Sequence, residues 1–468
     1  MDTKQENGFK RFKAFLLQPV DIAPLILLRI GFGLLGFIDV LSSYLHYHVQ
    51  LGAFDTSAFQ FPYIGFECIQ AIPDPYFSII MLLSLAGALG IIFGYKYRLS
   101  AVLFWIGFTY LFFLEKSHYL NHGYLFIWIG FLMIFLPADR AVSLRTVKQP
   151  EDKIDKVALL YIFPFIFMMS VVYFYGGLAK INPDWLRAQP LTAWLSYRAD
   201  RPIIGGLVGH EWAPWILSYG GLIFDLSIAF IMLTRPLRKF GIILAFSFHF
   251  TNLIIFNIGI FPWLSMVLTL LYFPAYEHRR FWIGLSKKVF LIHYFDQAIH
   301  KNGKNLQLSQ VPHIPHRKWQ PYIFVLLILG MTIHLTIPFR HHLYEGDVAW
   351  TEEGHRYSWR MKLRSKRARG YFEVVNTVTE ERQRIYPPDS LRRSQSNKLL
   401  THPDMIWQYA QHLKACHGTP EEPVQVFARI SAKLNDHPFK TYVDPEADLA
   451  NFQWSLFKPT PWILRYTD

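Results

Sequence analysis

The sequence predicts a polytopic α-helical membrane protein with about nine transmembrane helices and a C-terminal extracytoplasmic α+β domain. Apolar residues make up 52% of the 468 residues and charged residues only 17%, whereas soluble domains carry about 25% charged residues. The apolar residues gather into runs close to the roughly 20 residues that a bilayer core requires. Basic residues are also shared unevenly among the loops between these runs. Together these features exclude a disordered chain, a disulfide scaffold and a simple soluble enzyme.

Nine segments are long and apolar enough to be candidate spans. They cover residues 23–45, 77–95, 99–114, 121–137, 157–179, 214–234, 240–260, 262–275 and 321–338. The first contains Arg29 and Asp39, and the eighth is short. A re-entrant hairpin around Pro262, which would leave eight spans, is the alternative.

The loops that would face the cytosol with a cytosolic N-terminus contain 22 Lys and Arg residues, against five in the opposite loops. This asymmetry predicts a cytosolic N-terminus and, with nine spans, an extracytoplasmic tail. The polar, basic segment 1–20 is interpreted as part of an uncleaved signal anchor. Segment 277–320 is expected to lie on the membrane surface and contact anionic lipid. The net charge of +13 therefore reflects topology, and no basic, aromatic-interleaved patch predicts nucleic-acid binding.

The predicted domains are 1–338, in the membrane, and 339–468, outside the cytoplasm. In the second, residues 356–365, 371–379 and 424–434 have the composition of strands, and 402–417 has that of a helix. Cys68 and Cys416 both fall on the outer side, where disulfides persist. They are a candidate disulfide, and two unpaired cysteines are the alternative.

Lys180 is the most unusual polar residue within the predicted membrane region. It follows a long apolar run and the pair Gly176–Gly177, which permits close helix approach. Burial disfavours the charged form of a lysine, so such a residue can become a neutral amine and act as a base. A lysine that reaches to the membrane interface is the alternative reading.

Other ionisable or polar groups in the spans also mark candidate sites, because such groups are costly in a bilayer. They are Asn121 and His122 at the start of the fourth span, Asp225 in the sixth, and His249 with Asn252 in the seventh. Asp225 has no evident partner in the sequence, and Arg29 is only a guess for that partner. A haem held by His122 and His249 is one competing reading. The sequence has no HExxH or CxxC motif, and no metal is expected.

In four stretches the sequence resembles the vitamin K-dependent gamma-glutamyl carboxylase family, in its bacterial form. The matching stretches are NHGYLFIWIGFLMIFLPADRAVSL (121–144), VVYFYGGLAKINPDW (171–185), SFHFTNLIIFNIGIF (247–261) and YEGDVAWTEEGHRYSWRM (344–361). The similarity continues through HPDMIWQYA, YVDPEADL and WSLFKPTPWIL to the end of the chain. It therefore covers nearly the whole sequence.

The resemblance implies an enzyme that couples the O2-dependent epoxidation of reduced vitamin K, a phylloquinol or menaquinol, to the addition of CO2 to a peptide glutamate. It also implies that Lys180 is the base and that Asn121 and His122 hold the quinol oxygen. Tyr173, Asp225, His249 and Asn252 are expected to bind the substrate or to support its site. Membrane lipid, quinol and a glutamate-containing peptide or protein are the expected partners.

The chain departs from the animal members of this family in its shorter C-terminus, so propeptide recognition as in animals is not expected. Epoxidation without carboxylation is the alternative activity. A further alternative is that the protein is a non-catalytic relative that binds lipid. The sequence has no Asn-x-Ser/Thr sequon, which favours a bacterial inner membrane over the endoplasmic reticulum.

Overall fold

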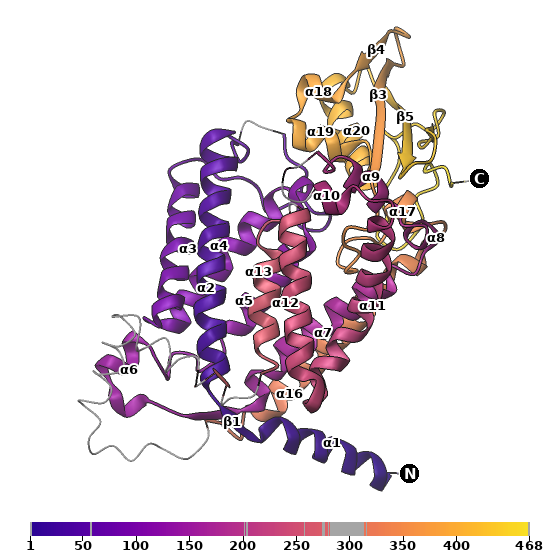
Figure 1. Cartoon of the computed structure of the whole chain (residues 1–468). Coiled ribbons are helices and arrows are strands. Elements are labelled where there is room, and N and C mark those ends of the chain that lie inside the picture. The colour runs from indigo at the N-terminus through magenta and orange to yellow at the C-terminus, as the bar shows by residue number, and fades with distance from the viewer. Residues whose placement is uncertain are drawn as a thin grey trace.

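A helical bundle forms most of the chain, and a smaller region of helices and strands covers one end of it (Figure 1). The computed structural model describes residues 2–56, 59–200, 202, 205–256, 258–273, 277–278, 280, 313–314 and 316–466. The N-terminus and the C-terminal region lie at opposite ends of the bundle (Figure 1), as an odd number of crossings requires. The surface helix expected within 277–320 falls almost entirely outside the described residues.

Each of the nine predicted spans coincides with a helix. These helices are α2 (Ala23–Ser43), α3 (Tyr76–Phe93), α4 (Tyr97–Leu114), α5 (Asn121–Met133), α7 (Phe163–Leu178), α11 (Ala213–Leu233), α12 (Arg238–Ile255), α13 (Phe261–Leu270) and α16 (Gln320–Thr336). Among the described residues, six helices are long and apolar enough to cross a membrane by themselves. The other three, α5, α7 and α13, have 13, 16 and 10 residues. At 1.5 Å per residue α13 covers about 15 Å, roughly half of a hydrocarbon core of about 30 Å.

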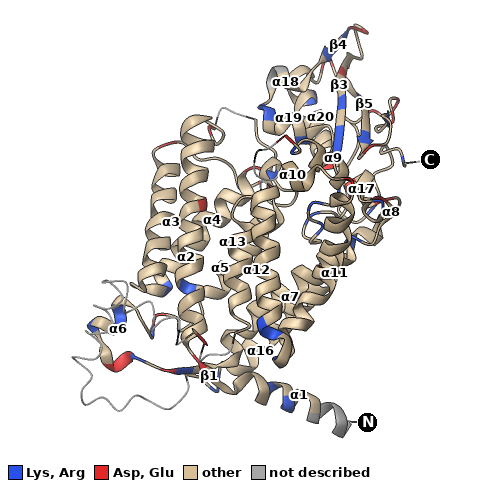
Figure 2. Cartoon of the chain, in the orientation of Figure 1, with Lys and Arg blue, Asp and Glu red and all other residues tan. Residues whose placement is uncertain are grey.

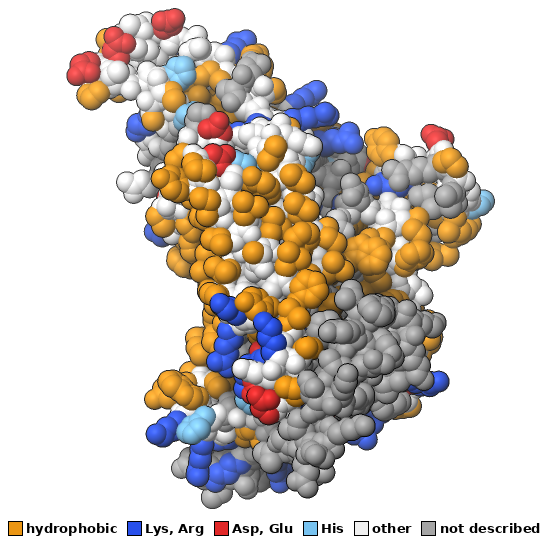
Figure 3. All heavy atoms as spheres, turned by 90° about the vertical axis from the view of Figure 1, so that its left-hand side faces the viewer, with side chains coloured by type: hydrophobic (Ala, Val, Ile, Leu, Met, Phe, Trp, Pro, Cys, Tyr) orange, Lys and Arg blue, Asp and Glu red, His pale blue; other side chains and the backbone are white. Residues whose placement is uncertain are grey.

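Short elements connect these helices. They are α1 (Asp2–Leu17), β1 (Pro19–Asp21), η1 (Tyr44–Gln50), η2 (Lys116–His118), α6 (Leu144–Lys148), η3 (Pro150–Asp152), β2 (Lys156–Ala158), η4 (Leu159–Tyr161), α8 (Pro183–Leu186), α9 (Leu191–Ser196), α10 (Gly205–Val208), η5 (Arg235–Leu237) and η6 (Ile337–Leu343). Charged residues gather at the two ends of the bundle (Figure 2). The surface between them carries a broad belt of hydrophobic side chains (Figure 3). This distribution is that of a protein embedded in a bilayer.

Arg29 lies in α2 and is only 1% exposed. Its guanidinium donates to the carbonyl oxygens of Ala138 and Val142 at 3.1 and 2.5 Å. The guess that Arg29 pairs with Asp225 is therefore wrong. Arg29 instead ties α2 to the loop after α5, where its hydrogens meet backbone acceptors that would otherwise be unpaired.

Helices α7 and α11 approach closely where α7 presents a glycine. A methyl group added at Gly177 would lie 2.8 Å from the Leu226 side chain and 2.9 Å from its backbone nitrogen. Only a residue without a side chain allows this approach. The pair Gly176–Gly177 thus does what the sequence predicted, and it brings the end of α7 against the middle of α11.

Gly177→Ala should therefore lower the melting temperature of the detergent-solubilised protein. The added methyl group must push the two backbones apart, and overpacking of this kind costs about 1–3 kcal/mol. Gly220→Ala on α11 is the matched control, because nothing lies within 4 Å of a methyl group there. An equal change of melting temperature in both variants would contradict the close-packing argument.

The C-terminal region is built on a four-stranded antiparallel sheet in the order β4-β3-β5-β6. Its elements are α17 (Val348–Thr351), β3 (Lys366–Asn376), β4 (Arg382–Ile385), α18 (Pro387–Ser390), α19 (Arg393–Leu399), α20 (Pro403–His417), β5 (Val424–Leu434) and β6 (Lys440–Thr441). Residues of β5 alternate strictly between buried and half-buried, so one face of the strand packs inward. Phe372 of β3 meets Tyr409 of α20 edge to face, with ring centroids 5.0 Å apart.

The predicted strand at 356–365 is wrong, whereas those at 371–379 and 424–434 overlap β3 and β5. Residues 356–365 form an irregular loop in which Tyr357, Trp359 and Lys362 have φ angles of 64°, 57° and 50°. Left-handed backbone of this kind cannot continue a strand. The loop lies outside the sheet because Trp359, 1% exposed, packs into the core of the helical bundle. The alternating pattern of the segment therefore reflects packing between the two parts of the chain.

Candidate active site

Lys180 lies just after the end of α7, and its ammonium group contacts α11. Nζ is 2.5 Å from Oδ2 of Asp225 and 3.2 Å from the carbonyl oxygen of Gly176. Lys180 and Asp225 are 8% and 7% exposed. Asp225 therefore has a partner, Lys180, and Lys180 does not reach out to the membrane interface. The sequence suggests a neutral amine at Lys180, and the structure places this side chain in a buried pair with Asp225.

Tyr173, within α7 and seven residues before Lys180, bonds to two other helices. Its hydroxyl lies 2.7 Å from Nε2 of His249 on α12 and 3.2 Å from Oγ1 of Thr269 on α13. Nδ1 of His249 is buried and has no hydrogen-bond partner among the described residues. Phe224 and Phe248 stack beside this group, with ring centroids 3.9 Å apart.

Asn121 and His122 begin α5. The hydroxyl of Tyr119 donates to Oδ1 of Asn121 at 2.8 Å, and it accepts the backbone N–H of Tyr357 at 2.6 Å. This chain fixes Oδ1 as the acceptor of the Asn121 amide and leaves Nδ2 as the donor. The His122 ring lies against Phe261, with centroids 6.0 Å apart.

One cavity of about 680 Å³ joins all of these residues. It is lined by the seven residues singled out from the sequence, which are Asn121, His122, Tyr173, Lys180, Asp225, His249 and Asn252. They come from α5, α7, α11 and α12, far apart in sequence. The volume lies within the range of small-molecule sites, about 300–1,000 Å³.

The outer wall of the cavity comes from the C-terminal region and is strongly basic. The lining residues there include Arg356, Arg360, Lys362, Arg364, Lys366 and Lys398. Arg356 pairs with Asp404 at 2.6 Å, and Arg364 pairs with Glu352. No ion pair is present for Arg360, Lys362 or Lys398 within the described part of the chain. Burial lowers the pKa of Arg360 to about 10 and also lowers the pKa of Lys362 and of Lys398, so an anion beside them would be favourable.

The sequence predicted no role for Arg360, Trp359 or Glu352, although the matching stretch 344–361 contains all three. The signal available was the density of basic residues in RMKLRSKRAR (360–369). Only the fold shows that the segment turns toward the membrane and lines the cavity.

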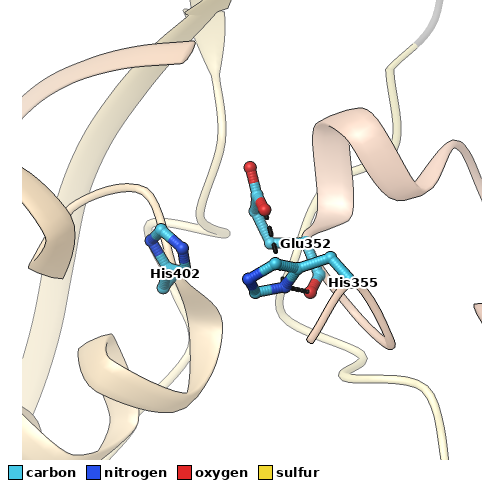
Figure 4. A group of neighbouring side chains, drawn as sticks. All are labelled: Glu352, His355 and His402. Carbon is cyan, nitrogen blue, oxygen red and sulfur yellow. Dashed lines mark hydrogen bonds and ion pairs between the residues drawn. The ribbon is translucent and has the colours of Figure 1, made fainter. Parts of the chain in front are cut away.

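Glu352, His355 and His402 form a cluster at the same wall (Figure 4). Nδ1 of His355 lies 2.5 Å from the carbonyl oxygen of Glu352, and Nδ1 of His402 lies 3.0 Å from that of Lys398. The ligand atoms lie within 4.8 Å of one another, close enough to consider a metal ion. However, Glu352 is already bound by Arg364, and Arg356, Lys366 and Lys398 are close enough to act on the cluster electrostatically. This surplus of positive charge opposes a further cation and suits an anion.

Glu352 should also stabilise the fold through Arg364. Burial alone would raise the pKa of Glu352, but Arg364, His355 and Lys366 lower it to about 2. Glu352→Gln should therefore reduce the free energy of unfolding at pH 7 by about 3 kcal/mol, at 1.36 kcal/mol per pKa unit. Because the folded pKa lies below the ordinary value of 4.5, this contribution is complete above pH 4.5 and is lost between pH 4.5 and 2.

Denaturant unfolding of wild type and variant at a series of pH values measures this effect. The difference in free energy should shrink as the pH falls from 4.5 toward 2. Glu380→Gln is the control, since Glu380 is exposed and should show no such difference. A constant difference over this pH range would refute the ion-pair explanation.

The two parts of the chain meet around the cavity through buried polar contacts. Nζ of Lys116 in η2 lies 2.6 Å from Oδ2 of Asp404 in α20. The side chain of Gln395 donates to Glu115 at 2.9 Å, and that of Asn435 donates to Asp184 at 2.5 Å. These contacts join the helical bundle to the C-terminal region.

The candidate disulfide is not formed. Cys68 and Cys416 are both free and exposed. Cys416 lies near the end of α20, where its sulfur is 3.6 Å from the His412 ring. The helix therefore directs this side chain to its own neighbour one turn earlier and to solvent.

Two known families match separate parts of the chain. The family described as HTTM domain matches residues 17–276, more than half of the chain. The family described as vitamin K-dependent gamma-carboxylase, lumenal domain, matches residues 319–468. No solved structure matches the chain. Lys180 and Asp225 lie within the first match and the basic wall within the second, so the cavity lies between the two. This multi-pass membrane protein, with its C-terminal region outside the cytoplasm, belongs to the vitamin K-dependent gamma-carboxylase family.

Proposed function

We propose that this protein oxidises a reduced naphthoquinone with O2 to its epoxide and uses this reaction to carboxylate glutamate in a peptide presented from the extracytoplasmic side. One observation carries the proposal. A single cavity runs from the buried pair Lys180–Asp225 in the helical bundle to Arg360, Lys362 and Lys398 in the C-terminal region, three cations without an ion pair among the described residues. A lipid-soluble acid and an anionic peptide side chain can thus meet in one cavity.

The residues of the inner part fit a reduced naphthoquinone. Val172, Phe248, Phe256 and Phe261 give it apolar walls, as an aromatic ring system requires. Nδ1 of His249 is a buried nitrogen without a partner, which a ring oxygen could satisfy. When bound, the reduced naphthoquinone supplies the oxidisable group whose reaction with O2 provides the driving force. The protein contributes orientation, proton uptake and exclusion of water.

Lys180 and Asp225 act together in proton uptake. The pair can accept one proton, because Asp225 is a carboxylate next to the Lys180 ammonium group. Lys180 passes one proton to the Asp225 carboxylate, which holds it, and as a neutral amine then takes the proton of a quinol hydroxyl. The positive charge of Lys180 then stabilises the oxygen that has lost it. Lys180 thereby keeps the role of base that the sequence predicts, but only with Asp225.

Asn121 and His122 hold the same oxygen from the other side. Tyr119 fixes the amide so that Nδ2 of Asn121 is the donor. The present contact of Nδ2, with the carbonyl oxygen of Arg360 at 3.5 Å, is long, so the group can turn to a substrate. Prearranged donors of this kind are the usual means of stabilising an oxygen anion.

The unpaired cations recognise the glutamate carboxylate. Arg360, Lys362 and Lys398 have no carboxylate of their own within the described residues, so an incoming carboxylate replaces water without breaking an ion pair. Charge-assisted hydrogen bonds of this type are stronger than neutral ones. Addition of CO2 creates a second carboxylate on the same carbon, and the same wall can balance its charge.

One incubation tests the proposal. The purified protein is supplied with quinol, O2, labelled bicarbonate and a glutamyl peptide, and epoxide and incorporated label are measured separately. Both products are expected. Epoxide without label would retain the oxidation and reject the carboxylation, and neither product would reject both. An absorbance spectrum with a Soret band would instead favour the haem reading. That reading has to free Nε2 of His249 from Tyr173 or use its other nitrogen.

A further inference from the structure

Three hydroxyl- or imidazole-bearing side chains meet at the inner wall of the cavity. Tyr173, His249 and Thr269 come from α7, α12 and α13, and they are 3%, 1% and 0% exposed. The Tyr173 hydroxyl is shared between them, 2.7 Å from Nε2 of His249 and 3.2 Å from Oγ1 of Thr269. Their placement on three packed helices fixes this arrangement.

His249 lines the cavity, and its second ring nitrogen makes no hydrogen bond to the described residues. This nitrogen, Nδ1, is buried. Leaving a buried nitrogen unpaired is costly. Nδ1 is therefore a built contact point for a polar atom of a ligand.

The protons of the three side chains allow two arrangements. In the first, Thr269 donates to Tyr173, Tyr173 donates to Nε2, and Nδ1 of His249 carries the imidazole hydrogen. In the second, Nε2 donates to Tyr173, Tyr173 donates to Thr269, and Nδ1 is a bare acceptor. Both contain the same number of protons and satisfy both internal hydrogen bonds. Nδ1 can thus be a donor or an acceptor without loss of an internal contact.

We propose that Tyr173 is a positioning residue that lets His249 bind a 1,4-naphthoquinone in either redox state. Nδ1 donates to the carbonyl oxygen of the oxidised ring and accepts from the hydroxyl of the reduced ring. This inference rests on the proposed function, since it takes the naphthoquinone as the ligand. Of the two ring oxygens, it assigns to His249 the one that lies away from Lys180 and Asp225.

Thr269→Val gives the sharpest test, because valine has the shape of threonine but cannot accept from Tyr173. Tyr173 must then donate to Nε2, and Nδ1 is locked as a donor. Binding of menadione and of its reduced form is measured under anaerobic conditions on the full-length protein, by quenching of the fluorescence of the cavity residues Trp185 and Trp194. The ratio of the quinol Kd to the quinone Kd should rise about tenfold in Thr269→Val, as expected for one hydrogen bond.

Two further variants complete the test. Tyr173→Phe removes the shared hydroxyl and should weaken both forms by a similar factor, leaving the ratio near that of wild type. Thr109→Val on α4 is the control, because the Thr109 hydroxyl has no hydrogen-bond partner in the described part of the chain and Thr109 does not line the cavity. An unchanged ratio in Thr269→Val, in protein that still oxidises quinol, would overturn this inference alone. Wild-type protein that binds neither form would overturn it together with the proposed function.

Discussion

Lys180→Ala should abolish epoxide formation while the protein still folds and inserts into the membrane. Positioned acid–base groups contribute about 10²–10⁴-fold to a rate, and this variant also leaves Asp225 as an unpaired buried carboxylate that would repel the quinol anion. A loss of at least 10³-fold is expected. The measurement is epoxide formed per enzyme under saturating quinol and O2. Inserted protein is quantified in the same membranes.

Lys180→Arg and Asp225→Asn separate the two members of the pair. Arginine keeps the positive charge but does not give up its proton, so folding should survive and the rate should still fall strongly. Asparagine keeps the shape but cannot hold the extra proton. Lys148→Ala, at an exposed residue of α6, is the control and should behave as wild type. Epoxide yield near the wild-type level in Lys180→Ala would remove Lys180 and Asp225 from the reaction.

The helices could be predicted from the sequence because a bilayer imposes one requirement on every segment of the chain. Backbone groups in hydrocarbon must bond within the segment, so an apolar run of sufficient length has to be a helix. The weak members of the prediction were the short ones. Both α5 and α13 end earlier than their apolar runs, and the length of a run says little about where a helix stops within it.

The candidate site could be predicted residue by residue but not pair by pair. Lys180, Asp225 and His249 each stood out because polar groups in a span are rare. The contact between Lys180 and Asp225 joins residues of two helices, and no spacing rule connects them. The loop at 356–365 was predicted wrongly for a related reason. Its alternating apolar residues match a strand, but Trp359 is buried against the helical bundle instead of against a second strand.

Arg360→Gln should uncouple the two products. Burial lowers the pKa of Arg360 to about 10, so the side chain remains charged at neutral pH. Its Nε has no hydrogen-bond partner among the described residues. Loss of a charge-assisted contact to the peptide carboxylate costs about 1.5–3 kcal/mol, which is about a 10- to 100-fold rise in the KM for the glutamyl peptide. Epoxide formation without peptide should stay near the wild-type rate, because the pair Lys180–Asp225 is unchanged.

Label incorporation and epoxide, measured separately over a range of peptide concentrations, give both quantities for Arg360→Gln. Arg384→Gln, at an exposed position of β4, is the control. An equal fall of both products would mean that Arg360 acts on the quinol. No change in either would exclude Arg360 from the carboxylate site. Each turnover converts a side chain with one carboxylate into one with two, so the wall holds the product more strongly than the substrate. Arg360→Gln should therefore relieve inhibition by carboxylated peptide by a larger factor than it raises the KM for the uncarboxylated one.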